Sequence, residues 1–144
     1  MAFTGNFMCT SFKVEILKAV HDFTNSSGNT FNIAMYDNSA SFTAATTAYT
    51  ATNEVSGTAY VAKGNTLVNV TPTSSSTTAL TDFGDSTWSS STITARGAMI
   101  FNDTASGDPS VVILDFGSDK VSSSGDFVVI FPTANSTSAI IRIA

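Results

Sequence analysis

The sequence predicts a mainly β protein: an antiparallel β-sandwich or barrel-like fold of about seven to nine strands with one N-terminal α-helix. Two observations predict it. After residue 28, short segments rich in Thr, Val, Ile and Phe recur about every 10 to 15 residues, with turn formers and no helical pattern between them. Before residue 28, one segment has helical spacing. A chain of 144 residues is one domain's length, so we expect a single domain over 1–144.

The helix is predicted over about residues 11–23. Its apolar side chains recur at helical spacing and form a stripe that we expect to be buried, made of Phe12, Ile16, Leu17, Val20 and Phe23. Ser11 or Thr10 can cap the first amides, and the turn formers of 24–28 end the helix. Because a helix of about three turns is marginal in isolation, it must pack on a sheet.

The first strand is predicted over 30–36, where apolar residues alternate and one face is expected to be buried. The polar stretch that follows, 37–58, is predicted to be a long loop with one edge strand at 48–51. Loops of this length are uncommon in compact domains unless they bind something, so the aromatic side chains of Phe42 and Tyr49 are candidate contact residues. The remaining predicted strands are 58–62, 66–71, 79–83, 91–101, 110–116, 126–131 and 139–143.

One motif occurs twice. Asp-Phe-Gly stands at 82–84 and again at 115–117, each followed by a run of three serines, at an offset of 33 residues. A duplicated hairpin explains this echo, and so do two similar turns in a biased composition. The kinase motif of the same letters needs a Gly-rich loop and a His-Arg-Asp loop, which the sequence lacks.

The charge pattern excludes several classes of protein. Only 12% of the residues are charged and the net charge is −5, so no basic stripe exists to bind nucleic acid or an anionic membrane. The longest apolar runs, 111–114 and 127–131, are far shorter than the ~20 residues of a membrane helix. The N-terminus lacks the pattern of a secretory signal, so we expect a protein made in the cytoplasm and not secreted.

No catalytic, cofactor or metal site is predicted. Cys9 and His21 are the one nucleophile–base pair, but a continuous helix would separate them by roughly 18 Å. Carboxylates at two sheet corners could in principle hold Ca²⁺, but they lack EF-hand spacing and are typical turn formers; they are Asp82, Asp85, Asp115, Asp119 and Asp126. We expect the large aromatic side chains of Trp88, Phe101 and Phe131 to belong to the core.

Taken together, several segments resemble a family of small virion structural proteins of tailed phages, notably those of cyanobacteria and marine bacteria. The resemblance runs nearly end to end and contains no catalytic signature; its segments are 9–13, 21–23, 31–36, 46–50, 54–57, 94–98, 114–117 and 139–143. It implies a non-enzymatic virion component, with the major capsid protein or other virion proteins as partners. Within the family we expect a capsid decoration or cement protein that forms a homo-oligomer. A tail, baseplate or fibre component is the alternative.

The apolar N-terminal segment suits such a role. Residues 1–10 are expected to form a docking arm, with Phe3, Phe7 and Met8 as further interface residues. The alternative, that this segment packs on the domain's own sheet, stays open. A function of another class is also open: a carbohydrate-binding module on the virion, reading sugar through Tyr49, Tyr60 or Trp88. The scarcity of charge favours a contact protein, because few charges then lose their hydration when subunits meet.

Overall fold

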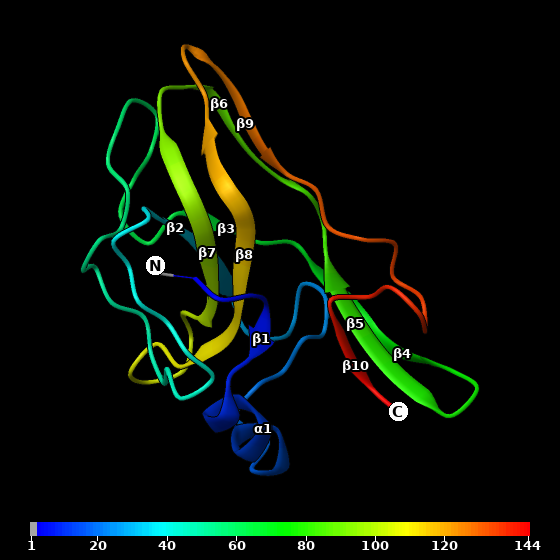
Figure 1. Cartoon of the computed structure of the whole chain (residues 1–144). Helices are drawn as coiled ribbons and strands as arrows, with labels where there is room; N and C mark the ends of the chain where they lie inside the picture. The colour runs from blue at the N-terminus through cyan, green and yellow to red at the C-terminus, as the bar shows by residue number, and fades with distance from the viewer. Residues whose placement is uncertain (1–2) are drawn as a thin grey trace.

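The computed structural model describes residues 3–144 and confirms the mainly β fold class (Figure 1). Met1 and Ala2, the first two residues of the predicted docking arm, lie outside the described residues. The described chain contains ten strands in antiparallel sheets and one short helix, and it does not close into a barrel.

A five-stranded antiparallel sheet forms one layer, with the order β1-β8-β7-β2-β3. Its strands are β1 (Phe7–Met8), β2 (Phe31–Tyr36), β3 (Asn65–Thr66), β7 (Thr94–Asn102) and β8 (Ser110–Val121). The central strand β7 pairs Ile100 with Ile33 of β2 and Ala98 with Leu114 of β8. All residues of β2 are buried, so both of its faces are covered. The alternation of apolar residues predicts burial of one face only.

The second layer consists of two smaller sheets. One has the order β10-β5-β4, and the other pairs β6 with β9. The strands are β4 (Asn69–Ser75), β5 (Thr78–Phe83), β6 (Ser86–Ser91), β9 (Gly125–Val129) and β10 (Ile141–Ile143). β5 continues through Gly84 and Asp85 into β6, so one stretch of chain contributes to both small sheets (Figure 1).

Aromatic side chains fill the core between the layers. Phe31 of β2 stacks on Phe23 with ring centroids 4.4 Å apart, and Phe83 of β5 packs against both rings. Trp88, Phe101 and Phe131 are buried, which confirms that these three residues belong to the core.

The helix α1 (Thr10–Leu17) is shorter than the predicted 11–23. Lys18 is its C-cap, and Ala19 has a positive φ of 57°. The amides of Ala19 and Val20 donate to the carbonyls of Ile16 and Glu15, which is the hydrogen-bond pattern of a Schellman motif. Glycine usually holds the left-handed position, so alanine there gave no stop signal. Leu17, predicted to be buried, is therefore one of the most exposed apolar side chains. The N-cap is Cys9, and it makes no side-chain capping hydrogen bond.

Three strand predictions differ clearly from the structure. The predicted strand 66–71 spans the end of β3 and the start of β4, which belong to different sheets. Residues 58–62 form turns with one isolated bridge, Thr58 to Thr92, because Ala59 and Lys63 adopt positive φ angles that a strand does not allow. The predicted edge strand at 48–51 is likewise a single bridge, Ala48 to Pro109. Conversely, the sequence does not predict β6, because Trp88 is its only large apolar residue and the others are four serines and Thr87.

The repeated Asp-Phe-Gly motif marks two different structures. The first copy ends β5 and begins the corner into β6. The second copy lies inside the continuous strand β8, where a register shift opposite Ala95 and Gly97 accommodates a positive φ of 75° at Gly117. The echo is therefore neither a duplicated hairpin nor a pair of similar turns.

Candidate contact surfaces

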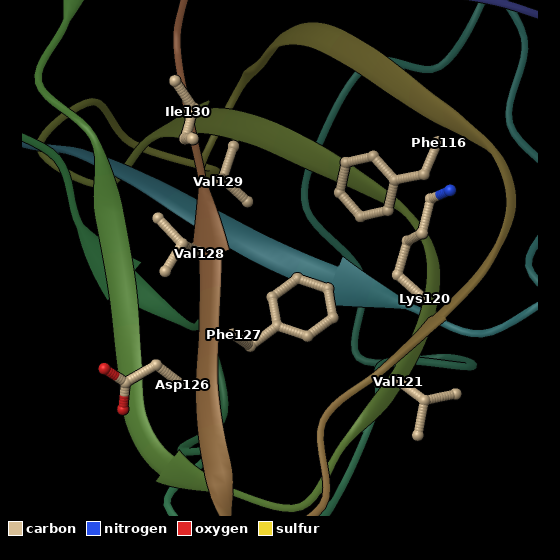
Figure 2. A pocket seen from close by; sticks show the side chains of 8 residues that line it. All are labelled: Phe116, Lys120, Val121, Asp126, Phe127, Val128, Val129 and Ile130. Atoms are coloured by element: carbon tan, nitrogen blue, oxygen red, sulfur yellow. The ribbon is translucent and has the colours of Figure 1, made fainter.

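An open groove with a volume of about 420 Å³ lies between β8 and β9 (Figure 2). Its lining residues are Phe116, Lys120, Val121, Asp126, Phe127, Val128, Val129 and Ile130. Phe127 projects from β9 toward Phe116 of β8, and the two ring centroids are 6.3 Å apart (Figure 2). The floor of the groove is therefore aromatic.

The groove exists because β8 and β9 separate after the turn that joins them. Ser91 and Ser122 hold this turn through a 2.7 Å hydrogen bond between their hydroxyls, and the amide of Ile93 donates to the Ser122 hydroxyl. Beyond the turn β8 pairs with β7, whereas β9 pairs with β6. On the other side of β8, β1 covers only Val112 and Ile113. In the described chain, each strand therefore retains an edge without a strand partner beside the groove.

The rim of the groove has three exposed apolar side chains and two charged ones, and the charged ones form no ion pair among the described residues. Val121 and Val128 are exposed, and Ile130 retains 76% of its accessible surface. The rim charges are engaged in hydrogen bonds: the Lys120 ammonium donates to the Ser118 hydroxyl, and the Asp126 carboxylate accepts the Ser90 amide. Exposed apolar side chains beside a free strand edge are features that suit an extended segment of another chain.

Sequence reasoning missed this groove, although a signal was present. The apolar run 127–131 is predicted to be part of a strand and is too short for a membrane helix, but the sequence assigns no role to its outer face. In a strand, alternate side chains face opposite sides. Phe127 and Val129 face the core, so Val128 and Ile130 must face outward. An unbroken apolar run in a two-layer protein thus indicates that the outer face of the strand is also suited to contact.

The predicted interface residues of the N-terminal segment pack on their own domain. Phe3 is buried and its ring meets that of Phe42 edge-on at 5.8 Å. Phe42 is buried too. Phe7 and Met8 form the half-buried strand β1 and pair with β8. Residues 3–10 thus follow the alternative that the sequence left open, in which this segment packs on the domain's own sheet.

One carboxylate, Glu54, joins three residues of the long loop to one another. No strand lies between β2 and β3, so the loop extends from 37 to 64 in the described chain. Glu54 accepts three hydrogen bonds: from the Tyr49 hydroxyl at 2.6 Å, from the Tyr60 hydroxyl at 2.7 Å and from the Lys63 amide at 2.7 Å. Burial, together with the hydrogen bond to Glu54, raises the pKa of Tyr49 to about 12.

Lys63 joins the loop to residues outside it. Its ammonium contacts the carboxylates of Asp103 at 2.7 Å and Asp108 at 2.8 Å, and it lies 5.6 Å from the centroid of the Tyr49 ring. The hydrogen bonds to these two carboxylates raise the pKa of Lys63. Tyr49, a predicted contact residue, is therefore part of the cover over the sheet.

The aromatic side chains considered for sugar binding are used inside the molecule. Trp88 is buried and stacks with Tyr60 at 6.1 Å between centroids. The Tyr60 hydroxyl accepts the Met35 amide and donates to Glu54, and burial raises its pKa. Tyr49 packs against Phe101 at 4.7 Å. These three rings do not form an exposed platform.

Cys9 and His21 do not form a nucleophile–base pair in the described structure. Cys9 is buried, and burial raises the pKa of its thiol. His21 is held by other groups: its Nε2 lies 2.8 Å from a Glu15 carboxylate oxygen, and its Nδ1 lies 3.1 Å from the Asn102 side-chain nitrogen. Both residues therefore have structural contacts in the packed region next to α1.

The carboxylates considered for Ca²⁺ are dispersed. Asp82 accepts the amides of Phe83 and Ile140, and Asp85 accepts the amide of Phe131. The rest are distributed as follows: Asp115 and Asp119 lie beside Arg96, and Asp126 accepts the Ser90 amide. Over residues 3–144, no three His, Cys, Asp or Glu side chains gather in a way that suits a metal ion.

The comparisons with known proteins add no relative: no family model, no curated protein and no solved structure matches the chain. The one helix among the described residues has eight residues and is too short to cross a bilayer.

Proposed function

We propose that this protein is a non-enzymatic structural component of a tailed-phage virion that binds the outside of the capsid shell as a decoration or cement protein. The observation that carries the proposal is the groove of β8 and β9, whose apolar rim and unpaired strand edges are suited to contact with another chain. The resemblance to small virion structural proteins supports it, and so does the low content of charged residues.

The physical basis of binding is the burial of apolar surface. Covering exposed apolar area contributes about 25 cal/mol per Å², and an extended segment laid along a free strand edge adds main-chain hydrogen bonds. Val121, Val128 and Ile130 supply the apolar area. The proposed partner is the major capsid protein or a neighbouring virion protein, with copies of this chain arranged as a symmetric oligomer on the shell.

Deletion of the gene tests this function. Particles without the protein are expected to assemble and then to release DNA at a lower temperature than complete particles, because the shell has lost contacts between its subunits. DNA release on heating is the measurement. Release at an unchanged temperature contradicts the role of a cement protein.

Complementation of the deletion tests the groove itself. The double variant Val128→Ser/Ile130→Ser is expected to leave particles as heat-sensitive as the deletion. The matched control is Val61→Ser/Val68→Ser, which changes two exposed valines away from the groove. It is expected to restore wild-type heat resistance. Equal rescue by the two variants contradicts the assignment of the groove.

A further inference from the structure

The outward face of α1 combines exposed apolar and basic side chains. Leu17 retains 88% of its accessible surface and Val14 retains 48%. Lys13 and Lys18 are exposed beside them. At about 100° per residue, the two apolar residues lie side by side on the helix, with one lysine on each flank. Phe12 points to the opposite side and is buried.

The two lysines differ from the chain's other cations. Lys63 and Arg96 lie beside carboxylates, Lys120 donates to Ser118, and Arg142 donates to main-chain carbonyls. Within residues 3–144, no ion pair or side-chain hydrogen bond engages the ammonium groups of Lys13 and Lys18. A protein with a net charge of −5 thus concentrates its two unengaged cations on one face of one helix.

Helix stability alone does not explain this face. A cation at the C-cap interacts favourably with the helix dipole, which accounts for Lys18. Lys13 lies in the first half of the helix, where the dipole disfavours a cation. Leu17 is almost fully exposed and so gains little from burial in the isolated chain, and a polar helix former would serve the helix equally well. A partner that covers Leu17 and meets both lysines accounts for all of these features.

We infer that this α1 face docks on a patch of the capsid-shell protein in which carboxylates flank an apolar hollow. The inference rests on the proposed function and names a second contact of the same protein. Charge complementarity selects the partner: the ammonium groups attract carboxylates, and Val14 and Leu17 fill the apolar hollow between them. A nucleic acid or an anionic bilayer fits less well, because two lysines would have to overcome the repulsion of phosphates by the chain's eleven acidic residues.

The position of the face suits a bridging protein. Figure 1 places α1 at one end of the molecule and the turn between β8 and β9 at the other. The α1 face and the groove can therefore contact two different subunits at once. A protein that joins neighbouring subunits needs two separated surfaces of this kind, and two simultaneous contacts raise the overall affinity through effective concentration.

Binding to particles that lack the protein tests the inference. Purified protein is added to particles from the deletion strain, and the bound copies are measured as a function of concentration. Leu17→Ser is expected to weaken binding about tenfold, whereas Val61→Ser, at a site with 73% exposure outside both surfaces, leaves binding unchanged. Both positions are exposed, so neither change is expected to disturb folding.

A second pair of variants tests the contribution of the two lysine charges to binding. Lys13→Gln/Lys18→Gln and Thr73→Glu/Ser75→Glu each make the chain more acidic by two charges, the latter on an exposed part of β4. The first is expected to weaken binding about tenfold and to abolish most of its salt dependence, and the second is expected to do neither. Lys13→Arg/Lys18→Arg keeps the charges and is expected to bind like the wild type.

The outcomes separate the two proposals. If the wild type binds and the α1 variants bind equally well, the α1 inference is wrong and the proposed function stands. If the wild-type protein does not bind the particles at all, the proposed function is wrong, and the partner named here falls with it. Binding to phosphatidylglycerol vesicles in place of particles, lost in Lys13→Gln/Lys18→Gln, also overturns the inference in favour of a membrane.

Discussion

The loop 37–64 and the sheet β10-β5-β4 differ in two ways. The loop lacks strands but has many side-chain contacts, whereas the sheet has paired strands but is largely exposed along β4. The loop has no strand, yet Glu54 joins Tyr49 and Tyr60 within it. The Lys63 ammonium ties it to the carboxylates of Asp103 and Asp108. The small sheet is regular, yet residues 71–76 of β4 and the following turn are all exposed.

The comparison also changes which surface is free for partners. The loop, predicted to be the contact surface, covers the sheet: the Tyr36 hydroxyl donates to the Thr50 carbonyl, and Phe42 packs edge-on against the Tyr36 ring at 4.7 Å. This cover explains why β2 is buried on both faces. The free surfaces lie where elements end, at the divergence of β8 and β9 and at the exposed face of α1.

The largest effect on stability is expected from removing the Glu54 hydrogen bonds within the loop. Glu54→Ala leaves the hydroxyls of Tyr49 and Tyr60 and the amide of Lys63 without their acceptor. We expect the free energy of unfolding to fall by about 3 kcal/mol, measured by urea denaturation. Glu54→Gln keeps one acceptor oxygen and is expected to lose less. If the alanine variant is as stable as the wild type, the Glu54 hydrogen bonds do not hold the loop together.

A smaller effect concerns the carboxylate that anchors the small sheet. Burial raises the pKa of Asp82 above its ordinary value of 3.8, with a further contribution from the nearby charge of Asp85. The folded state therefore holds this proton to higher pH than the unfolded chain does. Its contribution to stability is fully present below pH 3.8 and is lost as the pH rises through the folded-state pKa.

Asp82→Asn isolates this titration, because the remaining carboxylates titrate in both proteins. We expect the stability of the wild type relative to the variant to increase as the pH is lowered from 7 toward 3, measured by urea denaturation at each pH. A difference that is constant, or that grows toward neutral pH, contradicts the assigned direction.

The smallest effect is expected on the exposed part of β4. Thr73 and Ser75 belong to a regular strand, but their side chains face solvent. Thr73→Ala and Ser75→Ala are each expected to change the free energy of unfolding by less than about 0.5 kcal/mol. Thermal unfolding of these variants beside Glu54→Ala compares the two regions directly. A loss at β4 as large as that of the Glu54 variant removes the distinction between them.

The sequence predicted the features that depend on local pattern and missed those that depend on tertiary cover. The strands β2, β5, β7 and β8 follow from alternation and turn formers. The early helix end was not predictable from composition, because Ala19 occupies a position that glycine normally holds. The serines of β6 carry no strand signal. This strand forms because Trp88 packs into the core.

The contact surfaces show the same limit. Phe3, Phe42 and Tyr49 were chosen because exposed aromatic residues bind partners, but whether they are exposed depends on how the loop folds back. Ile130 and Leu17 were overlooked for the converse reason: each belongs to a segment whose pattern indicates burial. Only the positions of neighbouring elements decide which apolar residue is left uncovered.

Imaging of labelled particles tests the central claim most directly. A small tag fused to the protein is located by cryo-electron microscopy of purified virions of the tailed phage that, in our proposal, encodes it. Our account predicts tag density at symmetric positions on the outer surface of the capsid shell. Density confined to the tail, baseplate or fibres contradicts capsid decoration, and particles that contain no copy of the protein contradict a structural role in the virion.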